Sequence, residues 1–251
     1  MTDVPTLSVC IPAYEMAGKG AAYLEATFAT LAKQTLVNFD VVVSDQSSDA
    51  HIEALCQSWQ SKLDIKHIWF KDGPRQASAN VNNAMRHATA PLIKILFQDD
   101  LMIGNAGLQR MTDAFADPSV GWVLCGSGVT QDGVTIERPM VPRLTPKLHY
   151  GKNTVSSPSV LALRRDVGLM FDEDLQWLMD VAFYKELWMK LGAPAIVPET
   201  LVLNRLHVDQ VSAKITPALR RKEIAYAREK FGSQDSIAAR IEYYRQMIKA
   251  R

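Results

Sequence analysis

The chain has 251 residues, of which 47% are apolar and 22% are charged, and its formal net charge is +1. This length and balance are typical of one large globular α/β domain, or of one domain with a smaller appendage. A net charge so close to zero provides no global basic field, so we expect no nucleic-acid partner.

The sequence carries no basic-plus-apolar leader at its start and no apolar run near the roughly 20 residues of a membrane helix. Its three cysteines, Cys10, Cys56 and Cys125, are too few and too scattered for a disulfide framework or a CxxC zinc site. We therefore expect a cytoplasmic protein with reduced thiols, soluble or at most peripheral at the inner face of the membrane.

Apolar strands and amphipathic helices alternate through the first hundred residues. The predicted elements are strands at 7–14, 39–49, 64–70 and 92–97, and helices at 18–35, 50–60 and 76–89. The strands are apolar on both faces, which favours a parallel sheet with helices on each side.

The pattern is less regular after Pro118. The predicted elements are a hairpin at 120–139 with an Asp-Gly turn, a long loop at 139–157, helices at 158–168 and 175–192, a strand pair at 194–207, and helical sequence at 217–250.

Polar residues gather where the predicted strands of the first half end. They are Tyr14 and Glu15, 45–48, 72–75, and 98–100. Ligands of open α/β sheets bind at the carboxyl ends of the strands, so these turns form the candidate site. The absence of G-x-G-x-x-G after the first strand and of G-x-x-x-x-G-K-[ST] anywhere weighs against a dinucleotide dehydrogenase and a P-loop NTPase.

Two adjacent acids, Asp99 and Asp100, end the fourth apolar run "LIKILFQDD". Carboxylate oxygens suit Mg²⁺, which would neutralise the repelling pair and hold a diphosphate. The alternative is a solvated turn that opens a helix near Asn105, because acids also favour a helix N-terminus. Spacing alone leaves both interpretations open.

Two further acids have two interpretations each. Asp45 could accept a hydrogen bond from a nucleobase or a ribose, or it could form an Asx-turn. Asp49 is better placed to cap the helix that follows. Asp180, in "WLMDVAFYKELW", has apolar neighbours that would raise its pKa and suit a general base, but an acid there could equally cap the helix.

The late strands lead into "LNRLHVDQVS", which carries Arg205 and His207. Arg can clamp phosphate oxygens and His can bind phosphate or metal, although a lone surface His often has no role. The basic C-terminal stretch with Tyr243 and Tyr244 could contact an anionic membrane surface, or it could be the solvated face of a packing helix.

Five motifs in order resemble those of the family 2 glycosyltransferases, which have the GT-A fold. "LSVCIPAYE" resembles the family's strand ending in Pro-x-Tyr-Asn, and the stretch from "AYLEATF" to "VVVSDQSSDA" resembles its helix followed by a strand ending in "vDdgStD". "GPRQASANVNNAMRHATAPLIKILFQDD", "FDEDLQWLMDVAFYKEL" and "NRLHVDQVSA" are similar to the D-x-D block, the Glu-Asp segment and the "yR.H..q.S" tail. The resemblance covers roughly residues 5 to 215.

The resemblance implies a fold and a division of the chain. The fold is a GT-A type nucleotide-binding sheet, mainly parallel and flanked by helices. The glycosyltransferase domain is expected at 1–215, with a nucleotide-sugar-binding half at 1–104 and an acceptor-binding half at 105–215. A C-terminal helical extension is expected at 216–251.

The resemblance also implies roles by position. The residues expected at the nucleotide sugar are Pro12, Tyr14, Glu15, Asp45, Ser47, Arg75, Asn80, Gln98, Asp99 and Arg205. Asp99, with Asp100 and His207, is expected to bind a divalent cation, Mg²⁺ or Mn²⁺. Asp180 is expected to take the proton of the acceptor hydroxyl as that oxygen attacks the anomeric carbon, a single displacement that inverts this centre.

Two positions depart from the family pattern. Phe97 or Gln98 stands where the D-x-D motif has its first acid, so Gln98 could contact the sugar instead, and Met179 replaces the Glu of the Glu-Asp pair. The first change bears on metal dependence, whereas the base is retained as Asp180.

These observations predict an inverting glycosyltransferase that uses a nucleotide-diphosphate sugar. The expected acceptor is a glycan or lipid-linked glycan of a cell-surface polysaccharide or lipopolysaccharide, by analogy with soluble bacterial family members. The alternatives are a degenerate protein that binds a nucleotide sugar without transfer, and a sugar nucleotidyltransferase. "AYEMAGKGAA" provides poorly for the Gly-rich basic loop of the latter.

Overall fold

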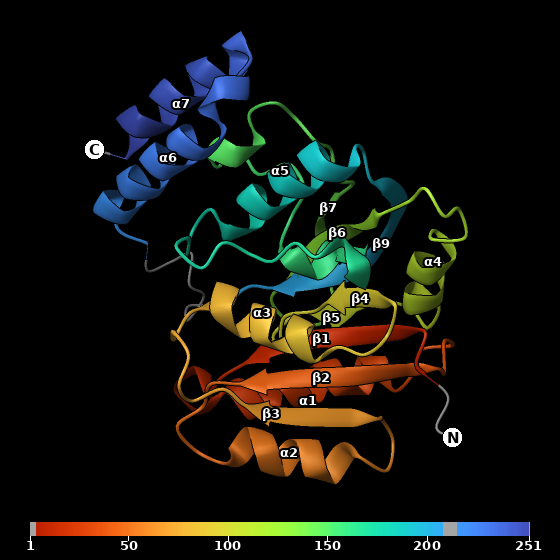
Figure 1. Cartoon of the computed structure of the whole chain (residues 1–251). Helices are drawn as coiled ribbons and strands as arrows, with labels where there is room; N and C mark the ends of the chain where they lie inside the picture. The colour runs from red at the N-terminus through yellow and green to blue at the C-terminus, as the bar shows by residue number, and fades with distance from the viewer. Residues whose placement is uncertain (1–3, 208–214, 251) are drawn as a thin grey trace.

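The computed structural model of the protein describes residues 4–207 and 215–250. Within them a nine-stranded sheet runs through both predicted halves of the chain, in the order β3-β2-β1-β4-β8-β6-β9-β5, with β7 paired to β6 (Figure 1). The strands are β1 Leu7–Ala13, β2 Phe39–Asp45, β3 Ile65–Trp69, β4 Leu92–Ile95, β5 Leu101–Met102, β6 Trp122–Thr130, β7 Glu137–Met140, β8 Leu161–Arg164 and β9 Ala195–Arg205.

The first half is the parallel, helix-covered sheet that its sequence predicts. β1 pairs in parallel with β2 and β4, and β2 pairs in parallel with β3. All seven residues of β1 are buried, because α1 and α3 cover opposite faces of the sheet (Figure 1). The helices of this half are α1 Gly20–Leu31, α2 His51–Trp59 and α3 Ala77–His87.

The second half of the sheet is mixed. β8 runs antiparallel to β4 and β6, β7 runs antiparallel to β6, and β5 runs antiparallel to β9. Among the described strand pairs of this half, only β6 and β9 are parallel. The turn at Asp132 and Gly133 joins β6 to β7 without a crossover, which requires an antiparallel pair. The mainly parallel character therefore belongs to the first half of the sheet.

Two predictions of secondary structure differ from the structure. The helix expected at 158–168 is a short strand, β8, between 3₁₀ turns at Pro158–Val160 and Arg165–Val167. The strand pair expected at 194–207 is the single strand β9, whose register against β6 shifts near Gly126. Short apolar runs are ambiguous between helix and strand, and here pairing with β4 and β6 decides in favour of the strand.

The C-terminal extension is a pair of helices, α6 Pro217–Phe231 and α7 Ile237–Lys249. They pack on each other and on the 3₁₀ turn Leu148–Tyr150, which also contacts α5 Met179–Leu191. Figure 1 places this pair beside α5 and away from β1, β2 and β3. No helix of the described residues has both the length and the apolar character needed to cross a membrane.

Candidate functional site

A cavity of about 530 Å³ opens at the carboxyl ends of β1 and β4. Residues of both predicted halves line it. The predicted site residues that line it are Pro12, Tyr14, Glu15, Arg75, Asn80, Gln98, Asp99, Asp100 and Asp180. Asp45, Ser47, Arg205 and His207 lie behind this lining layer and contact its members or their neighbours.

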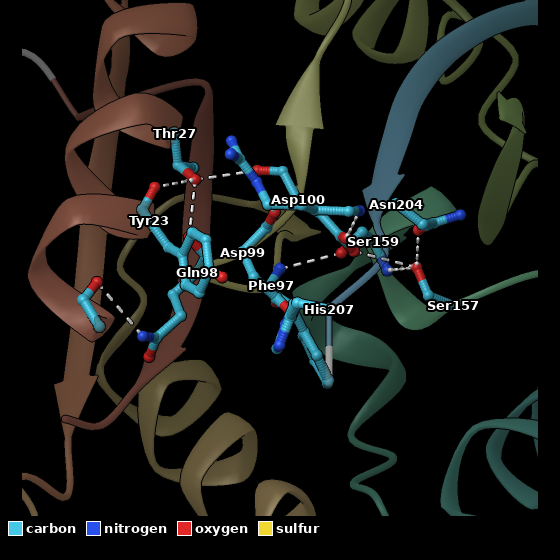
Figure 2. Close-up of polar contacts among 12 residues, drawn as sticks. Tyr23, Thr27, Phe97, Gln98, Asp99, Asp100, Ser157, Ser159, Asn204 and His207 are labelled. Atoms are coloured by element: carbon cyan, nitrogen blue, oxygen red, sulfur yellow. Dashed lines mark hydrogen bonds and ion pairs between the residues drawn. The ribbon is translucent and has the colours of Figure 1, made fainter. Parts of the chain in front are cut away.

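Asp99 and Asp100 point to different partners, which separates the adjacent charges (Figure 2). The Asp99 carboxylate lies 2.8 Å from Nε2 of His207, whose ring lies against Tyr23 at a centroid distance of 5.0 Å. Asp99 is partly exposed toward the cavity, whereas Nδ1 of His207 is buried without a hydrogen-bond partner. Asp99 is therefore the member of the pair that can reach a ligand.

Asp100 is a buried structural acid. It accepts hydrogen bonds from the Ser157 hydroxyl at 3.2 Å and from the backbone N–H of Arg205 at 3.3 Å. Burial, with the negative charge of Asp99, raises the pKa of Asp100 to about 7. The Thr27 hydroxyl of α1 lies 2.9 Å from the Asp100 carbonyl oxygen, so the acid turn is fixed to the helix (Figure 2).

Gln98 uses its side-chain amide to hold the end of β1. Its Oε1 accepts from the backbone N–H of Tyr14 at 2.6 Å, and its Nε2 donates to the Tyr14 carbonyl oxygen at 3.0 Å. Gly20 makes this approach possible, because a Cβ there would overlap the same carbonyl oxygen. Gln98 thus lines the cavity mainly as a support for Tyr14.

Glu15 and Arg75 form an ion pair of 3.0 Å at the cavity rim. Arg75 also donates to the Gln46 carbonyl oxygen at 3.1 Å, and Oε2 of Glu15 is buried without a hydrogen-bond partner. A buried carboxylate oxygen beside a cavity is available to a donor on a ligand.

Asp45 is fully buried at the end of β2. Its carboxylate accepts from the backbone N–H of Ser47 at 2.8 Å, which is an Asx-turn, and lies 2.9 Å from Nε2 of His67. Asp49 accepts from the His51 N–H at the start of α2, but the N-cap of this helix is Ala50, which makes no side-chain cap hydrogen bond, so the predicted cap by Asp49 is wrong. Asp45 and Ser47 therefore shape the turn that brings Gln46 to the cavity.

Asn80, on α3, reaches under the cavity floor. Its Nδ2 donates to the Ala13 carbonyl oxygen at 2.9 Å, and its buried Oδ1 has no hydrogen-bond partner. Arg205 is not one of the residues that line the cavity. Its guanidinium lies over the Tyr23 ring at 5.1 Å, and its Nε lies 3.3 Å from the Asp99 carbonyl oxygen.

Asp180 lies in the first turn of α5 and faces the cavity from the second half of the chain. Its Oδ2 accepts from Asn153 at 2.8 Å, and its Oδ1 accepts from the backbone N–H of Val181 at 2.7 Å. Burial, assisted by the negative charge of Glu223, raises the pKa of Asp180 to about 7. The N-cap of α5 is Leu178, so Asp180 is not the capping residue that the alternative interpretation required.

The cavity also has lining residues beyond those predicted to hold the nucleotide sugar, to hold the cation or to act as the base. They are Met16, Gln46, Gln76, Ala77, Phe97, Ser157, Pro158, Gln176, Trp177, Met179, Asn204 and Ile215. Gln176 and Trp177 lie four and three residues before Asp180 in "LQWLMD", so proximity to the predicted base was a signal for them. The Ser157 hydroxyl donates to the side chain of Asn204 on β9, and neither residue carried such a signal.

The sequence matches a known protein family over most of its length. The family described as Glycosyl transferase family 2 matches residues 8–188. The chain belongs to glycosyl transferase family 2. The tail motif of the resemblance continues into residues 208–213, which lie outside the described residues.

Two curated relatives match part of the chain. Validoxylamine A glucosyltransferase of Streptomyces hygroscopicus subsp. jinggangensis is 39% identical over 128 residues, which are 50% of this chain and 29% of that protein. Chondroitin synthase of Escherichia coli is 34% identical over 91 residues, which are 36% of this chain and 13% of that protein. The chain thus matches less than a third of the length of either relative.

Solved structures share the fold across nearly the whole chain. S. aureus TarS 1-349 in complex with UDP-GlcNAc has a TM-score of 0.68 at 17% identity, covering 98% of this chain and 72% of that one. Mannosyltransferase PcManGT from Pyrobaculum calidifontis, in complex with GDP-Man and Mn²⁺, has a TM-score of 0.65 at 20% identity, covering 94% of this chain and 66% of that one. At these identities the likeness establishes the GT-A fold alone.

The family implies a divalent cation. The side chains present fit a cation that is coordinated partly by the protein and partly by a bound ligand. The described residues contain no cluster of three or more His, Cys, Asp and Glu side chains arranged as a metal cage. Asp99, however, presents a partly exposed carboxylate to the cavity with His207 behind it. Mg²⁺ is commonly held in this way, by one or two carboxylates with phosphate oxygens and water.

Proposed function

We propose that this family 2 member is an inverting glycosyltransferase that moves a sugar from a nucleoside diphosphate to an acceptor hydroxyl. One observation carries the proposal: Asp180, with a pKa raised to about 7, and Asp99 line the same cavity from opposite halves of the chain. A group with such a pKa is half deprotonated near neutral pH and suits general-base work.

The proposed reaction is a single displacement. The acceptor hydroxyl gives its proton to the Asp180 carboxylate while its oxygen forms a bond to the anomeric carbon. The bond from that carbon to the diphosphate oxygen breaks, and its electron pair leaves with the nucleoside diphosphate. Attack opposite the leaving group inverts the anomeric centre, and no second carboxylate nucleophile is needed, unlike in retaining glycosidases.

A nucleoside diphosphate sugar suits the polar groups around the cavity. Glu15 Oε2 and Asn80 Oδ1 are buried acceptors without protein partners, and such atoms can receive N–H or O–H groups of a base or a sugar. TarS and PcManGT were solved with UDP-GlcNAc and GDP-Man, which supports this donor class.

We propose Asp99 as the residue that holds the cation, with His207 orienting its carboxylate and Asp100 behind it. Nε2 of His207 at 2.8 Å supports this arrangement, in the manner of an outer partner that fixes a metal ligand. When bound, Mg²⁺ or Mn²⁺ would supply positive charge to the departing diphosphate. The complex of PcManGT with Mn²⁺ supports a metal of this kind.

We propose a glycan or lipid-linked glycan as the acceptor, in the synthesis of a cell-surface polysaccharide or lipopolysaccharide on the cytoplasmic side of the membrane. The part of chondroitin synthase that this chain resembles supports a polysaccharide product. Trp177 lines the cavity beside Asp180 and offers an aromatic face to a sugar ring.

We further propose that α7 contacts the membrane peripherally. Ile237, Ile241, Tyr244 and Ile248 repeat at helical spacing and are 54 to 78% exposed. Arg240, Arg245 and Lys249 are exposed on the same helix, whose single acid, Glu242, is buried. An apolar stripe flanked by cations without exposed acids suits an anionic lipid surface, and two copies of such a face would repel each other.

The missing first acid of D-x-D, where Phe97 or Gln98 stands, favours a second candidate, a protein that binds a nucleotide sugar without transferring it. A donor screen separates the two. Nucleoside diphosphate release is measured for UDP-, GDP- and dTDP-sugars with Mg²⁺, with Mn²⁺ and with EDTA. We expect release with one donor class and a divalent cation, whereas a protein that only binds would show donor affinity without release.

A further inference from the structure

A carboxylate of the C-terminal extension is built into the segment that carries the proposed base. Glu223, on α6, is 1% exposed. Its Oε1 accepts from the backbone N–H of Gln176 at 2.9 Å, and its Oε2 accepts from those of Trp177 and Leu178 at 2.9 and 2.8 Å. One side chain therefore binds three consecutive backbone N–H groups.

These three N–H groups form the entry to α5. A helix leaves its first N–H groups without partners inside the helix, and the N-cap of α5, Leu178, makes no side-chain cap hydrogen bond. Glu223 accepts from the N–H of this N-cap residue and from the two N–H groups before it, and its negative charge is favourable at the helix N-terminus. α6 thus fixes the segment that leads into α5.

The segment fixed by Glu223 is also a wall of the cavity. Gln176, Trp177, Met179 and Asp180 all line it. One turn before Glu223 on α6, the Arg220 guanidinium lies over the Trp177 ring at 5.1 Å.

The loop that carries Asn153, the other partner of Asp180, is also held by the C-terminal extension. The side chain of Asp235, after α6, is buried and accepts from the Tyr150 hydroxyl at 2.6 Å and from Arg228 at 2.5 Å. His149 Nε2 lies 3.0 Å from it. The loop that follows Tyr150 carries Asn153, which donates to Asp180.

We infer that Glu223 is a positioning residue for the Asp180 carboxylate and that the C-terminal helix pair is a working part of the catalytic unit. This inference rests on the proposed transfer reaction. Glu223 touches no reacting atom in it, because its carboxylate is occupied by the backbone of residues 176–178.

Glu223 also acts on the charge state of the base. The groups around Asp180 are Asn153 from the preceding loop, Tyr184 from α5 and Glu223 from α6. Asn153 is neutral, and burial holds the pKa of Tyr184 far above its ordinary value, so Tyr184 is neutral as well. The negative charge of Glu223 therefore helps to raise the pKa of Asp180, and its removal moves this pKa downward.

Glu223→Gln tests the inference in the full-length protein, with Glu229→Gln as the matched control because Glu229 is exposed on the same helix. The amide can accept only at its oxygen, so at least one N–H group of residues 176–178 loses its partner. We expect kcat to fall roughly ten- to hundredfold. Donor Kd should stay within about twofold. The acid limb of the pH–rate profile should move to lower pH, and the control should behave as the wild type.

Glu223→Asp keeps the charge and serves if the amide variant fails to fold. We expect it to lower kcat while leaving the acid limb in place. Equal loss of donor affinity and kcat with an unmoved acid limb in Glu223→Gln would mean a merely structural role and would overturn the inference. Wild-type kcat in Glu223→Gln would do the same.

Hydrogen exchange at residues 176–178 gives a readout that does not depend on activity. We expect faster exchange there in Glu223→Gln than in Glu229→Gln, and unchanged exchange would overturn the inference. If Asp180→Asn keeps a normal rate, the proposed reaction fails, whatever Glu223→Gln does to the exchange. The two failures are therefore distinguishable.

Discussion

Asp180 and Asp99 differ in chemistry although each is an acid that lines the same cavity. Asp180 is held by Asn153 and by its own helix, and burial raises its pKa to about 7. Asp99 keeps a partly exposed carboxylate that is paired with His207. One acid is thus suited to exchange a proton and the other to hold positive charge.

The raised pKa of Asp180 predicts how activity depends on pH. A base must be deprotonated, so we expect kcat/KM to fall about tenfold per pH unit below pH 7 and to level off above it. The measurement is kcat/KM at saturating metal between pH 5 and 9. A profile that stays flat down to pH 5 would contradict the assignment, because an ordinary carboxylate remains ionised there.

Asp99→Ala tests the cation site. We expect nucleoside diphosphate to bind at least about tenfold more weakly with Mn²⁺, because phosphate oxygens alone then hold the cation, and nearly unchanged in EDTA. Calorimetric titration under both conditions measures this, with Asp113→Ala on the exposed end of α4 Gly107–Asp113 as the control. Equal weakening under both conditions would indicate a structural role for Asp99.

At the scale of elements, the acid turn, α1 and the end of β1 form one unit. Gln98 pairs with both backbone groups of Tyr14, and Thr27 of α1 lies 2.8 Å from the Gln98 carbonyl oxygen. Gln98, which stands in the altered D-x-D segment, thus serves to fix the β1 side of the cavity.

Gly20→Ala tests this unit. The added Cβ would overlap the Tyr14 carbonyl oxygen and crowd the Gln98 amide. We expect a loss of about 1–3 kcal/mol in the free energy of unfolding, measured by denaturant titration, together with weaker donor binding. In the control Gly121→Ala the atoms nearest to the new methyl group belong to the end of the Leu191 side chain, which can move aside, so both variants losing equal stability would contradict this view.

Much of the fold could be predicted from the pattern of apolar residues, but some of it could not. The long apolar run of β1, which is buried along its whole length, was enough to predict a strand of a buried sheet. Leu161–Arg164, in contrast, is too short for its periodicity to distinguish strand from helix. Asp99 and Asp180 could be selected because acids stand out in apolar runs. Glu223 could not be selected, because an acid in a basic helix is expected to be solvated and because its partners are backbone groups distant in sequence.

At the scale of the molecule, the helix pair α6 and α7 joins two roles. Through Glu223 it reaches the proposed base, and through the exposed side of α7 it offers an apolar and basic face. Contact of that face with a membrane would bring the cavity to a lipid-linked acceptor.

Vesicle binding tests the α7 face. We expect the protein to co-sediment with vesicles of phosphatidylcholine and phosphatidylglycerol, and not with phosphatidylcholine alone. Arg240→Gln with Lys249→Gln should weaken this binding about thirtyfold, because each cation near an anionic surface contributes about 1 kcal/mol. Lys62→Gln on the distant α2 side is the control. Vesicle binding that does not depend on the lipid charge would contradict the lipid assignment. Self-association of the protein that is lost in Ile241→Ser would contradict it as well.

The most direct test of the account is Asp180→Asn, which keeps the shape of the side chain and removes the base. With the donor and cation found in the screen, donor Kd is measured by calorimetry and turnover by nucleoside diphosphate release in the presence of acceptor. The account predicts that turnover falls at least about a hundredfold while donor Kd stays within about twofold. A near-normal rate in Asp180→Asn would contradict it.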